Sequence, residues 1–189
     1  MWETLGAMRR LGALLWLLAL CALSACGSGA PTGGARLGDY VGGSVPIECA
    51  PFARALTGVR LAGAADDWWE EAAGRYRRVA APQVGGILVL RRSDRLPYGH
   101  VAVVTQVLSS RQVLVSQANW VHHRVSQDQP VVDVSPRNDW SLVRVWWPPT
   151  DQLGITDYPA RGFILPGWPA SHDALIAAVP RAIRVAEAE

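Results

Sequence analysis

Lysine is absent from this 189-residue chain, and charge of either sign is scarce. All 18 basic side chains are arginines, and with 16 acidic residues the formal net charge is only +2. Six of the arginines form two short clusters, at residues 75–78 and 91–95, and the others are scattered along the chain. A nucleic-acid-binding protein concentrates its basic side chains on one element, so we expect no nucleic-acid partner.

The N-terminal region lacks a hydrophobic run long enough to span a membrane. Its apolar run, residues 11–22, has 12 residues, whereas a membrane-spanning helix needs about 20. The run follows Arg9 and Arg10, and a basic start before a short apolar core is typical of a signal peptide. The next residues, Leu-Ser-Ala-Cys, resemble the lipobox of bacterial lipoproteins. This resemblance implies removal of residues 1–25 as a signal peptide and acylation of Cys26.

Export determines which cysteine stays free and where the protein is located. Cys21 would leave with the signal peptide and Cys26 would carry lipid, so Cys49 would be the single free thiol of the mature chain. Gly27, rather than aspartate, after the lipidated cysteine suggests sorting to the outer membrane of a Gram-negative bacterium, with the domain in the periplasm. One alternative is an ordinary secretory signal, which would leave Cys26 as a spare thiol. Another is that the true start of the chain is Met8. Each of them places the domain outside the cytoplasm.

The remaining chain is long enough for one domain with a hydrophobic core. Residues 26–45 are rich in Gly, Ala and Ser and are predicted to form a flexible tether from the lipid to the domain. Residues 46–166 would form the folded domain, and residues 167–189 a C-terminal tail. That tail could contain a helix over residues 173–185, interrupted by Pro180, or could be frayed.

Two helices are predicted at the start of the domain. The first begins at Cys49, because Pro51 lies just inside the helix start, where its missing N–H costs nothing, and Gly58 lies just past the end. The second is indicated by Asp66 and Asp67, whose carboxylates suit a helix N-terminus. Its last turn would hold basic side chains that suit the opposite end of the helix dipole: Arg75, Arg77 and Arg78.

The periodicity changes from helix to strand after these helices. Runs rich in β-branched residues, separated by Gly, Pro, Ser and Asp, occur at residues 86–91, 100–107, 113–116 and 141–146. The short connections between successive runs favour antiparallel pairing. We therefore predict an α+β fold in which N-terminal helices pack on an antiparallel sheet.

The chemistry of the chain is indicated by Cys49 and His100. A thiol at a helix N-terminus beside a histidine has its pKa lowered from about 8.5 to roughly 3.5–7.5, which makes it a nucleophile. His100 opens a strand directly after Gly99, and a strand holds its side chain in a fixed direction. The imidazole needs a polar group that fixes its tautomer. Gln117 and Asn119, two residues apart on the next strand, share one face and are candidates.

Together these residues resemble the CHAP family, the cysteine- and histidine-dependent amidohydrolases and peptidases of the papain-like group that cut bacterial peptidoglycan. The resemblance covers residues 46–147. Its motifs are Glu-Cys-Ala-Pro-Phe from residue 48, Trp-Trp from 68, Pro-Gln-Val-Gly-Gly from 82, Gly-His-Val-Ala-Val-Val from 99, and Ala-Asn-Trp from 118. Residues 132–140 also resemble an extension found in a proteobacterial subgroup. The resemblance implies a papain-like α+β fold and peptidoglycan as the partner and substrate.

Roles follow from the resemblance residue by residue. It implies that Cys49 is the nucleophile and His100 the general base and then acid. Many members carry Glu where this chain has Gln117, so Asn119 becomes the better candidate for orienting the imidazole, with Trp120 close to the site. The implied activity is that of an N-acetylmuramoyl-L-alanine amidase or a peptidoglycan endopeptidase. No cofactor or metal is expected.

Other interpretations of these residues stay open. Gln117 in place of Glu also fits a non-catalytic wall-binding or scaffolding lipoprotein, while a secreted wall-degrading toxin conflicts with the lipid anchor. A regulatory protein of the envelope is a further possible partner. His122 and His123 suit a loop better than a metal site, because no third ligand lies at a regular spacing.

Aspartates and tryptophans of the domain also allow two interpretations each. Asp133 and Asp139 are expected at turns, although an aspartate could orient His100 in place of Asn119 if its loop folded back. Six tryptophans could pack in the core or stack on sugar rings, and we expect the core for most of them: Trp68, Trp69, Trp120, Trp140, Trp146 and Trp147.

Overall fold

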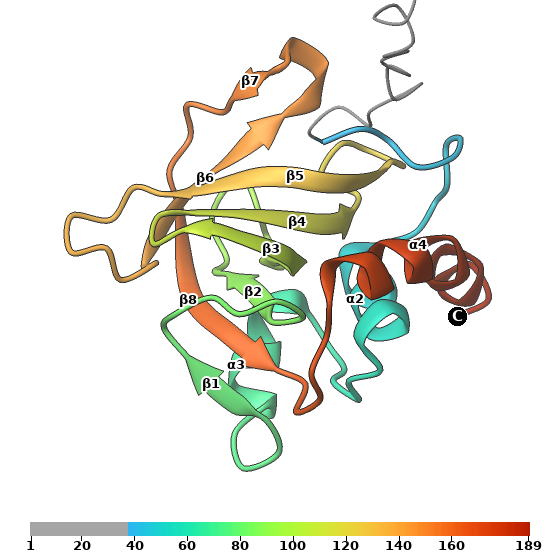
Figure 1. Cartoon of the computed structure of the whole chain (residues 1–189), viewed down its shortest axis with the longest axis horizontal. Coiled ribbons are helices and arrows are strands. Elements are labelled where there is room, and N and C mark those ends of the chain that lie inside the picture. The colour runs from blue at the N-terminus through green and yellow to red at the C-terminus, as the bar shows by residue number, and fades with distance from the viewer. Residues whose placement is uncertain (1–37) are drawn as a thin grey trace, which may run out of the picture. The chain divides into compact units, whose positions relative to one another are not determined.

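Antiparallel strands dominate residues 38–189, the part of the chain that the computed structural model describes (Figure 1). The strands are β1 (Arg77–Val79), β2 (Ile87–Leu90), β3 (His100–Ser109), β4 (Gln112–Ala118), β5 (Val125–Asp133), β6 (Leu142–Trp147), β7 (Gln152–Leu153) and β8 (Tyr158–Leu165). The α-helices of this part are α2 (Cys49–Thr57), α3 (Trp68–Glu71) and α4 (His172–Ala186), and short 3₁₀ turns lie at Ala65–Asp67 and Pro148–Thr150. The predicted signal peptide and Cys26 lie outside the described residues.

The sheet closes on itself. Its strand order is β1-β8-β2-β3-β4-β5-β6-β7, and β8 pairs with β6 as well as with β2, so six of the strands form a barrel-like ring. The mixed α+β class and the antiparallel pairing agree with the prediction from sequence. The closure of the sheet was not predicted, because β8 was not recognised from the sequence and it is the strand that joins the two ends.

Helix α2 begins and ends as predicted. It starts at Cys49 and stops at Gly58, whose φ of 69° places it in the left-handed region that favours glycine. The second predicted helix is much shorter than expected, because α3 ends at Glu71 and turns follow up to Gly74, whose φ is 73°. Arg77, predicted in the last helical turn, belongs instead to β1, which pairs with β8.

Both ends of the predicted domain need correction. Residues 38–45, assigned to the tether by their composition, lie along β5 and its preceding turn: the Gly38 N–H donates to Asp128 O at 3.1 Å and the Val41 N–H to Val125 O at 2.9 Å. At the other end, α4 is an integral helix rather than a loose tail. Its Val179 and Ala182 are buried in a cluster with Phe52 of α2. No helix within residues 38–189 has both the length and the apolar character needed to cross a bilayer.

Two apolar clusters lie on opposite faces of the ring. One fills the space between the strands and includes Leu88, Val104 and Phe163. The other lies between the sheet and the helices, where Ala53 of α2 and Trp68 of α3 are buried with alternate residues of β2 and β3. This second cluster fixes α2 against β3, and the start of α2 thereby comes to lie beside the start of β3.

Candidate active site

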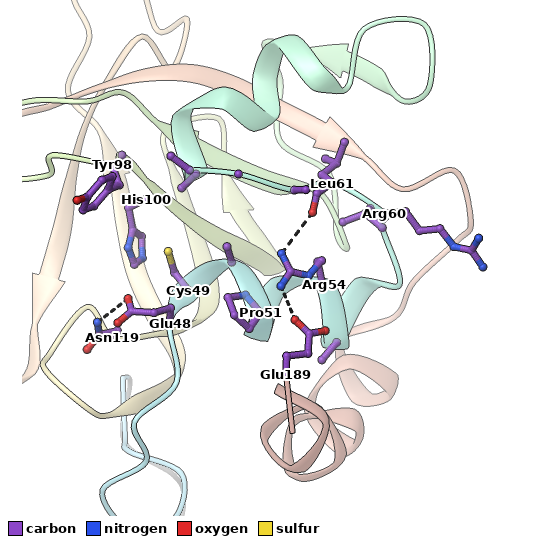
Figure 2. A pocket seen from close by; sticks show the side chains of 18 of the residues that line it. Glu48, Cys49, Pro51, Arg54, Arg60, Leu61, Tyr98, His100, Asn119 and Glu189 are labelled. Carbon is purple, nitrogen blue, oxygen red and sulfur yellow. Dashed lines mark hydrogen bonds and ion pairs between the residues drawn. The ribbon is translucent and has the colours of Figure 1, made fainter. Parts of the chain in front are cut away.

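The Cys49 thiol is presented by the first residue of α2. Cys49 is half-buried, and Phe52 and Ala53, one turn further on, are fully buried and anchor the helix. Figure 2 shows the sulfur directed toward the His100 imidazole, with Glu48 below them and hydrogen-bonded to Asn119. The structure therefore brings together the two residues that the sequence analysis singled out, 51 positions apart in the chain.

His100 is held by its strand and by the turn before it. Leu90 on β2 lies opposite His100, and His100 is only 4% exposed. Gly99 has a φ of 74°, and a Cβ atom there would come within 2.6 Å of the Leu90 carbonyl oxygen. Only glycine fits this position, and it lets the chain enter β3 with the imidazole facing Cys49. Trp120 contacts the ring edge-on, with 5.1 Å between centroids.

A buried chain of hydrogen bonds extends from the imidazole across the sheet. His100 Nε2 lies 2.7 Å from Gln117 Oε1, and Gln117 Nε2 donates to Gln129 Oε1 at 2.9 Å. Gln129 Nε2 in turn donates to the backbone carbonyl of Trp146. Both glutamines are almost completely buried. We call His100, Gln117, Gln129 and the Trp146 carbonyl the amide relay; its members lie on β3, β4, β5 and β6, four adjacent strands.

The far end of the amide relay determines the tautomer of His100. The Trp146 carbonyl can only accept, so it faces the NH₂ of Gln129, and the Gln129 oxygen must face Gln117. That oxygen requires the NH₂ of Gln117, which leaves the Gln117 oxygen for the imidazole. His100 Nε2 therefore carries the proton and donates it, and Nδ1 keeps the lone pair that could accept a proton from the thiol.

Asn119 does not occupy the orienting position that we predicted for it. Its Nδ2 donates to Glu48 Oε2 at 2.8 Å, and its Oδ1 accepts from the His123 N–H at 2.9 Å. The reason is local: Asn119 has a φ of 59° just after β4, so its side chain leaves the face that Gln117 uses. Asn119 still lines the groove beside His100, where it holds the Glu48 carboxylate.

Burial keeps both groups neutral in the resting site. It raises the pKa of the Cys49 thiol to about 11, helped by the negative charge of Glu48 and opposed by backbone hydrogen bonds from Val101, Ala50 and Cys49. It also lowers the pKa of His100 to about 4, against the opposing effects of Gln117 and Glu48. The sequence analysis expected a thiolate with a lowered pKa. This expectation was wrong, because the cost of burying a charge exceeds the gain from the helix N-terminus.

Cys49 and His100, which we call the dyad, line a large groove. A cavity of about 1310 Å³ runs from Cys49 and His100 along α2 to the end of α4, where Arg54 is ion-paired with Glu189. Tyr98 and Arg95, in the turn before His100, form part of its wall. A substrate chain of several residues can therefore reach the sulfur from solvent.

Comparison with known proteins identifies a protein family that part of this chain matches. Residues 38–119 match the family model for the CHAP domain. Residues 38–119 are therefore identified as a CHAP-domain segment. The match includes α2 with Cys49, the start of β3 with His100, and Gln117 and Asn119 of the site. No curated protein matches the chain by sequence.

The remaining candidates lie away from the CHAP dyad. The rings of His122 and His123 stack on each other with 3.7 Å between centroids, and residues 38–189 contain no group of three or more His, Cys, Asp or Glu side chains arranged to hold a metal. Asp133 and Asp139 accept hydrogen bonds from the backbone N–H groups of Ser135 and Ser141, as turn residues do.

The CHAP site also contains residues that the sequence analysis did not identify. The most important is Gln129, since it completes the amide relay from a strand that was not predicted. Arg95 and Tyr98 were missed as well, because residues of a turn give no periodic signal. Of the six tryptophans, Trp68 and Trp140 are buried and Trp147 is the most exposed, at 38%; the other three, Trp69, Trp120 and Trp146, are half-buried.

Proposed function

We propose that this protein hydrolyses an amide bond of peptidoglycan, with Cys49 as the nucleophile and His100 as the general base and then the general acid. The proposal rests on one observation: the Cys49 thiol is directed toward the His100 imidazole at the wall of an open groove. The amide relay leaves the Nδ1 lone pair of this imidazole free. Membership of residues 38–119 in the CHAP family supports this class of substrate and reaction.

The neutral resting dyad requires proton transfer during attack. As the Cys49 sulfur bonds to the amide carbonyl carbon, His100 Nδ1 takes the thiol proton, so no free thiolate accumulates. The imidazolium then gives this proton to the departing amine nitrogen as the carbon–nitrogen bond breaks, leaving a thioester. Water attacks the thioester carbon and loses a proton to His100, and the thiolate leaves and recovers that proton. The products are a carboxylic acid and an amine.

Two parts of the site would stabilise charge in this reaction. The N–H of Cys49 lies at the N-terminus of α2, where unpaired backbone donors and the helix dipole favour the developing oxyanion. Gln117 accepts from His100 Nε2 and supports the imidazolium, though less strongly than a carboxylate would.

We further propose the setting that the N-terminal sequence indicates. Residues 1–25 would be removed, Cys26 would be lipidated, and the domain would face the cell wall from the outer membrane of a Gram-negative envelope. Since residues 38–45 lie along β5 and its preceding turn, the tether would be shorter than the sequence suggested.

Release of soluble fragments from purified sacculi tests the proposed reaction. We expect Cys49→Ala to abolish release, because no other group near His100 can form the acyl intermediate, while its unfolding temperature stays close to that of the wild type. Equal release by the wild type and Cys49→Ala would refute the proposal.

The raised pKa of Cys49 favours one alternative, a wall-binding CHAP protein without turnover. Iodoacetamide should modify Cys49 slowly at neutral pH, and about tenfold faster per pH unit up to about pH 11, because only the thiolate reacts. Both hypotheses share this profile, so turnover separates them. A scaffold would sediment with sacculi and release nothing at any pH.

A further inference from the structure

The groove continues past His100 into a second region that the proposed reaction does not use. A pocket of about 360 Å³ shares Arg95, Leu96, His100 and Asn119 with the main groove. It leads on to a pocket of about 370 Å³ beneath the β6–β7 hairpin. We call these two pockets together the aromatic subsite, because both are lined by Trp120, Trp147 and Tyr158.

We propose that the aromatic subsite binds a sugar ring of the peptidoglycan strand, so that the bond cut is the amide between the glycan's lactyl group and the first alanine of the stem peptide. This inference rests on the proposed function and adds to it the direction in which the substrate lies.

The shape and chemistry of the aromatic subsite suit a pyranose. Trp147 is 38% exposed, and Trp120 and Tyr158 contact each other edge-on with 5.1 Å between centroids, so ring faces and edges line an open pocket. Aromatic side chains offer a flat apolar surface together with N–H or O–H groups, which matches the mixed apolar and hydroxyl surface of a sugar. Ile155, which is 90% exposed, adds to the apolar rim.

The main groove on the other side of the dyad has the opposite character. Arg60, Arg95 and Arg181 line it, and no ion pair of their guanidinium groups occurs within residues 38–189. Stem peptides carry several carboxylates, which such free guanidinium groups would bind. Arg95 lines all three pockets and so lies at the junction.

The position of the dyad between these two regions selects the bond. A strand with its sugar in the aromatic subsite and its acidic peptide in the main groove places the connecting amide beside Cys49. Its lactyl carbonyl carbon would form the thioester, and the alanine nitrogen would leave with the proton from His100. An endopeptidase would instead have peptide on both sides of the sulfur, and the aromatic subsite offers no second set of free cations beyond Arg95.

The aromatic side chains of the aromatic subsite come from outside the matched family segment. Trp147, Tyr158 and Ile155 all follow residue 119, on β6, β8 and the loop between them. The proposed sugar site is therefore a property of this chain's own later strands.

Glycan binding tests the subsite without requiring turnover. The probe is a soluble, peptide-free oligosaccharide of alternating N-acetylglucosamine and N-acetylmuramic acid, titrated by calorimetry into the full chain carrying Cys49→Ala. We expect binding, and a Kd about tenfold weaker when Trp147→Ala is added, as the loss of one aromatic contact would give. The matched control adds Trp168→Ala, an exposed tryptophan outside the subsite, and should leave the Kd unchanged.

Product analysis tests the bond. Digestion of sacculi by the wild-type protein should release peptides with a new N-terminal alanine and leave glycan with free lactyl carboxylates. No glycan binding, or equal Kd values for the two tryptophan variants, would overturn the sugar site. Fragments in which peptide stays attached to glycan would overturn the choice of bond while leaving the proposed hydrolase intact. If nothing is released, the hydrolase fails, and the binding titration still decides the sugar site.

Discussion

Residues 38–119 and residues 120–189 contribute to one site in different ways. The first segment matches the CHAP family and supplies the thiol, the imidazole and Gln117. The second has no part in that match, yet it supplies Gln129 and the Trp146 carbonyl, which set the tautomer, and most of the aromatic subsite. The comparison shows that the family motifs carry the reacting atoms, whereas the strands that close the ring carry the groups that direct them.

Removing a reacting group from the first segment should have the largest effect. We expect His100→Ala to lower kcat by about 10²–10⁴-fold, the usual contribution of a positioned general base. Fragment release from sacculi measures it. The matched control is His122→Ala, at an exposed position away from the dyad, which should keep wild-type activity. A His100→Ala protein that is folded and retains more than half of the wild-type rate would contradict the proposed base.

Breaking the amide relay from the second segment should have a smaller effect of a distinct kind. Gln129→Leu leaves the Trp146 carbonyl and the Gln117 NH₂ without partners, which should lower the free energy of unfolding by about 1–3 kcal/mol. Gln117 could then turn over, so the Nε2–H tautomer of His100 would lose its preference and kcat should fall about tenfold, a change equivalent to about 1.4 kcal/mol.

Nitrogen-15 NMR of the imidazole separates positioning from mere stability in this variant. The wild type should show a protonated Nε2 and a bare Nδ1, and Gln129→Leu a mixture. Gln127→Leu on the same strand is the control, since the Gln127 side chain takes no part in the relay. If Gln129→Leu lowers stability while the ring-nitrogen shifts stay at their wild-type values, Gln129 has a structural role only.

The smallest expected effect concerns the attachment of α4, far from the chemistry. His172 Nε2 lies 3.0 Å from Asp128 Oδ2, and Nδ1 lies 3.3 Å from Asp173, so these carboxylates raise the pKa of His172 above its ordinary 6.5. Thr105 shares Asp128 by donating to Oδ1 at 2.6 Å. The stabilisation is complete below the unfolded pKa and is lost as the pH rises through the raised pKa.

A comparison of unfolding temperatures measures this linkage. Because the pair is partly exposed, we expect His172→Gln to lower Tm by about 1–2 °C at pH 6 and to have almost no effect at pH 9. An equal change at the two pH values would show that the charge of His172 does not stabilise α4.

The parts of the fold that followed from sequence are those with strong local signals. Pro51 and Gly58 mark the limits of α2, and the apolar runs of β2, β3, β4 and β6 were found because packing on both faces requires Val, Ile and Leu. Helix α4 was one of two alternatives for its segment, and the structure confirms it, with Pro180 on its exposed side.

The parts that did not follow depend on partners distant in the chain. Strand β5 has the sequence of a loop, because it carries Ser126, Asp128, Gln129 and Pro130. The buried amide of Gln129 finds its partners only on the neighbouring strands β4 and β6. In β8, Pro159 and Gly162 interrupt the strand pattern. The sequence analysis preferred Asn119 to Gln117 as the residue that orients His100. It did so because Gln129, which orients the Gln117 amide, lies on the unpredicted strand β5.

The amide relay also makes activity depend on the correct register of the strands that it crosses. Each of its links crosses from one strand to the next, over β3, β4, β5 and β6, and a shift of one residue turns every side chain of a strand to the opposite face. A protein in which β4 or β5 paired one residue out of register would still contain the Cys49 thiol and the His100 imidazole. Its imidazole would no longer be oriented by Gln117. Catalytic competence would then report on the alignment of four adjacent strands, including β5, which does not line the proposed substrate site.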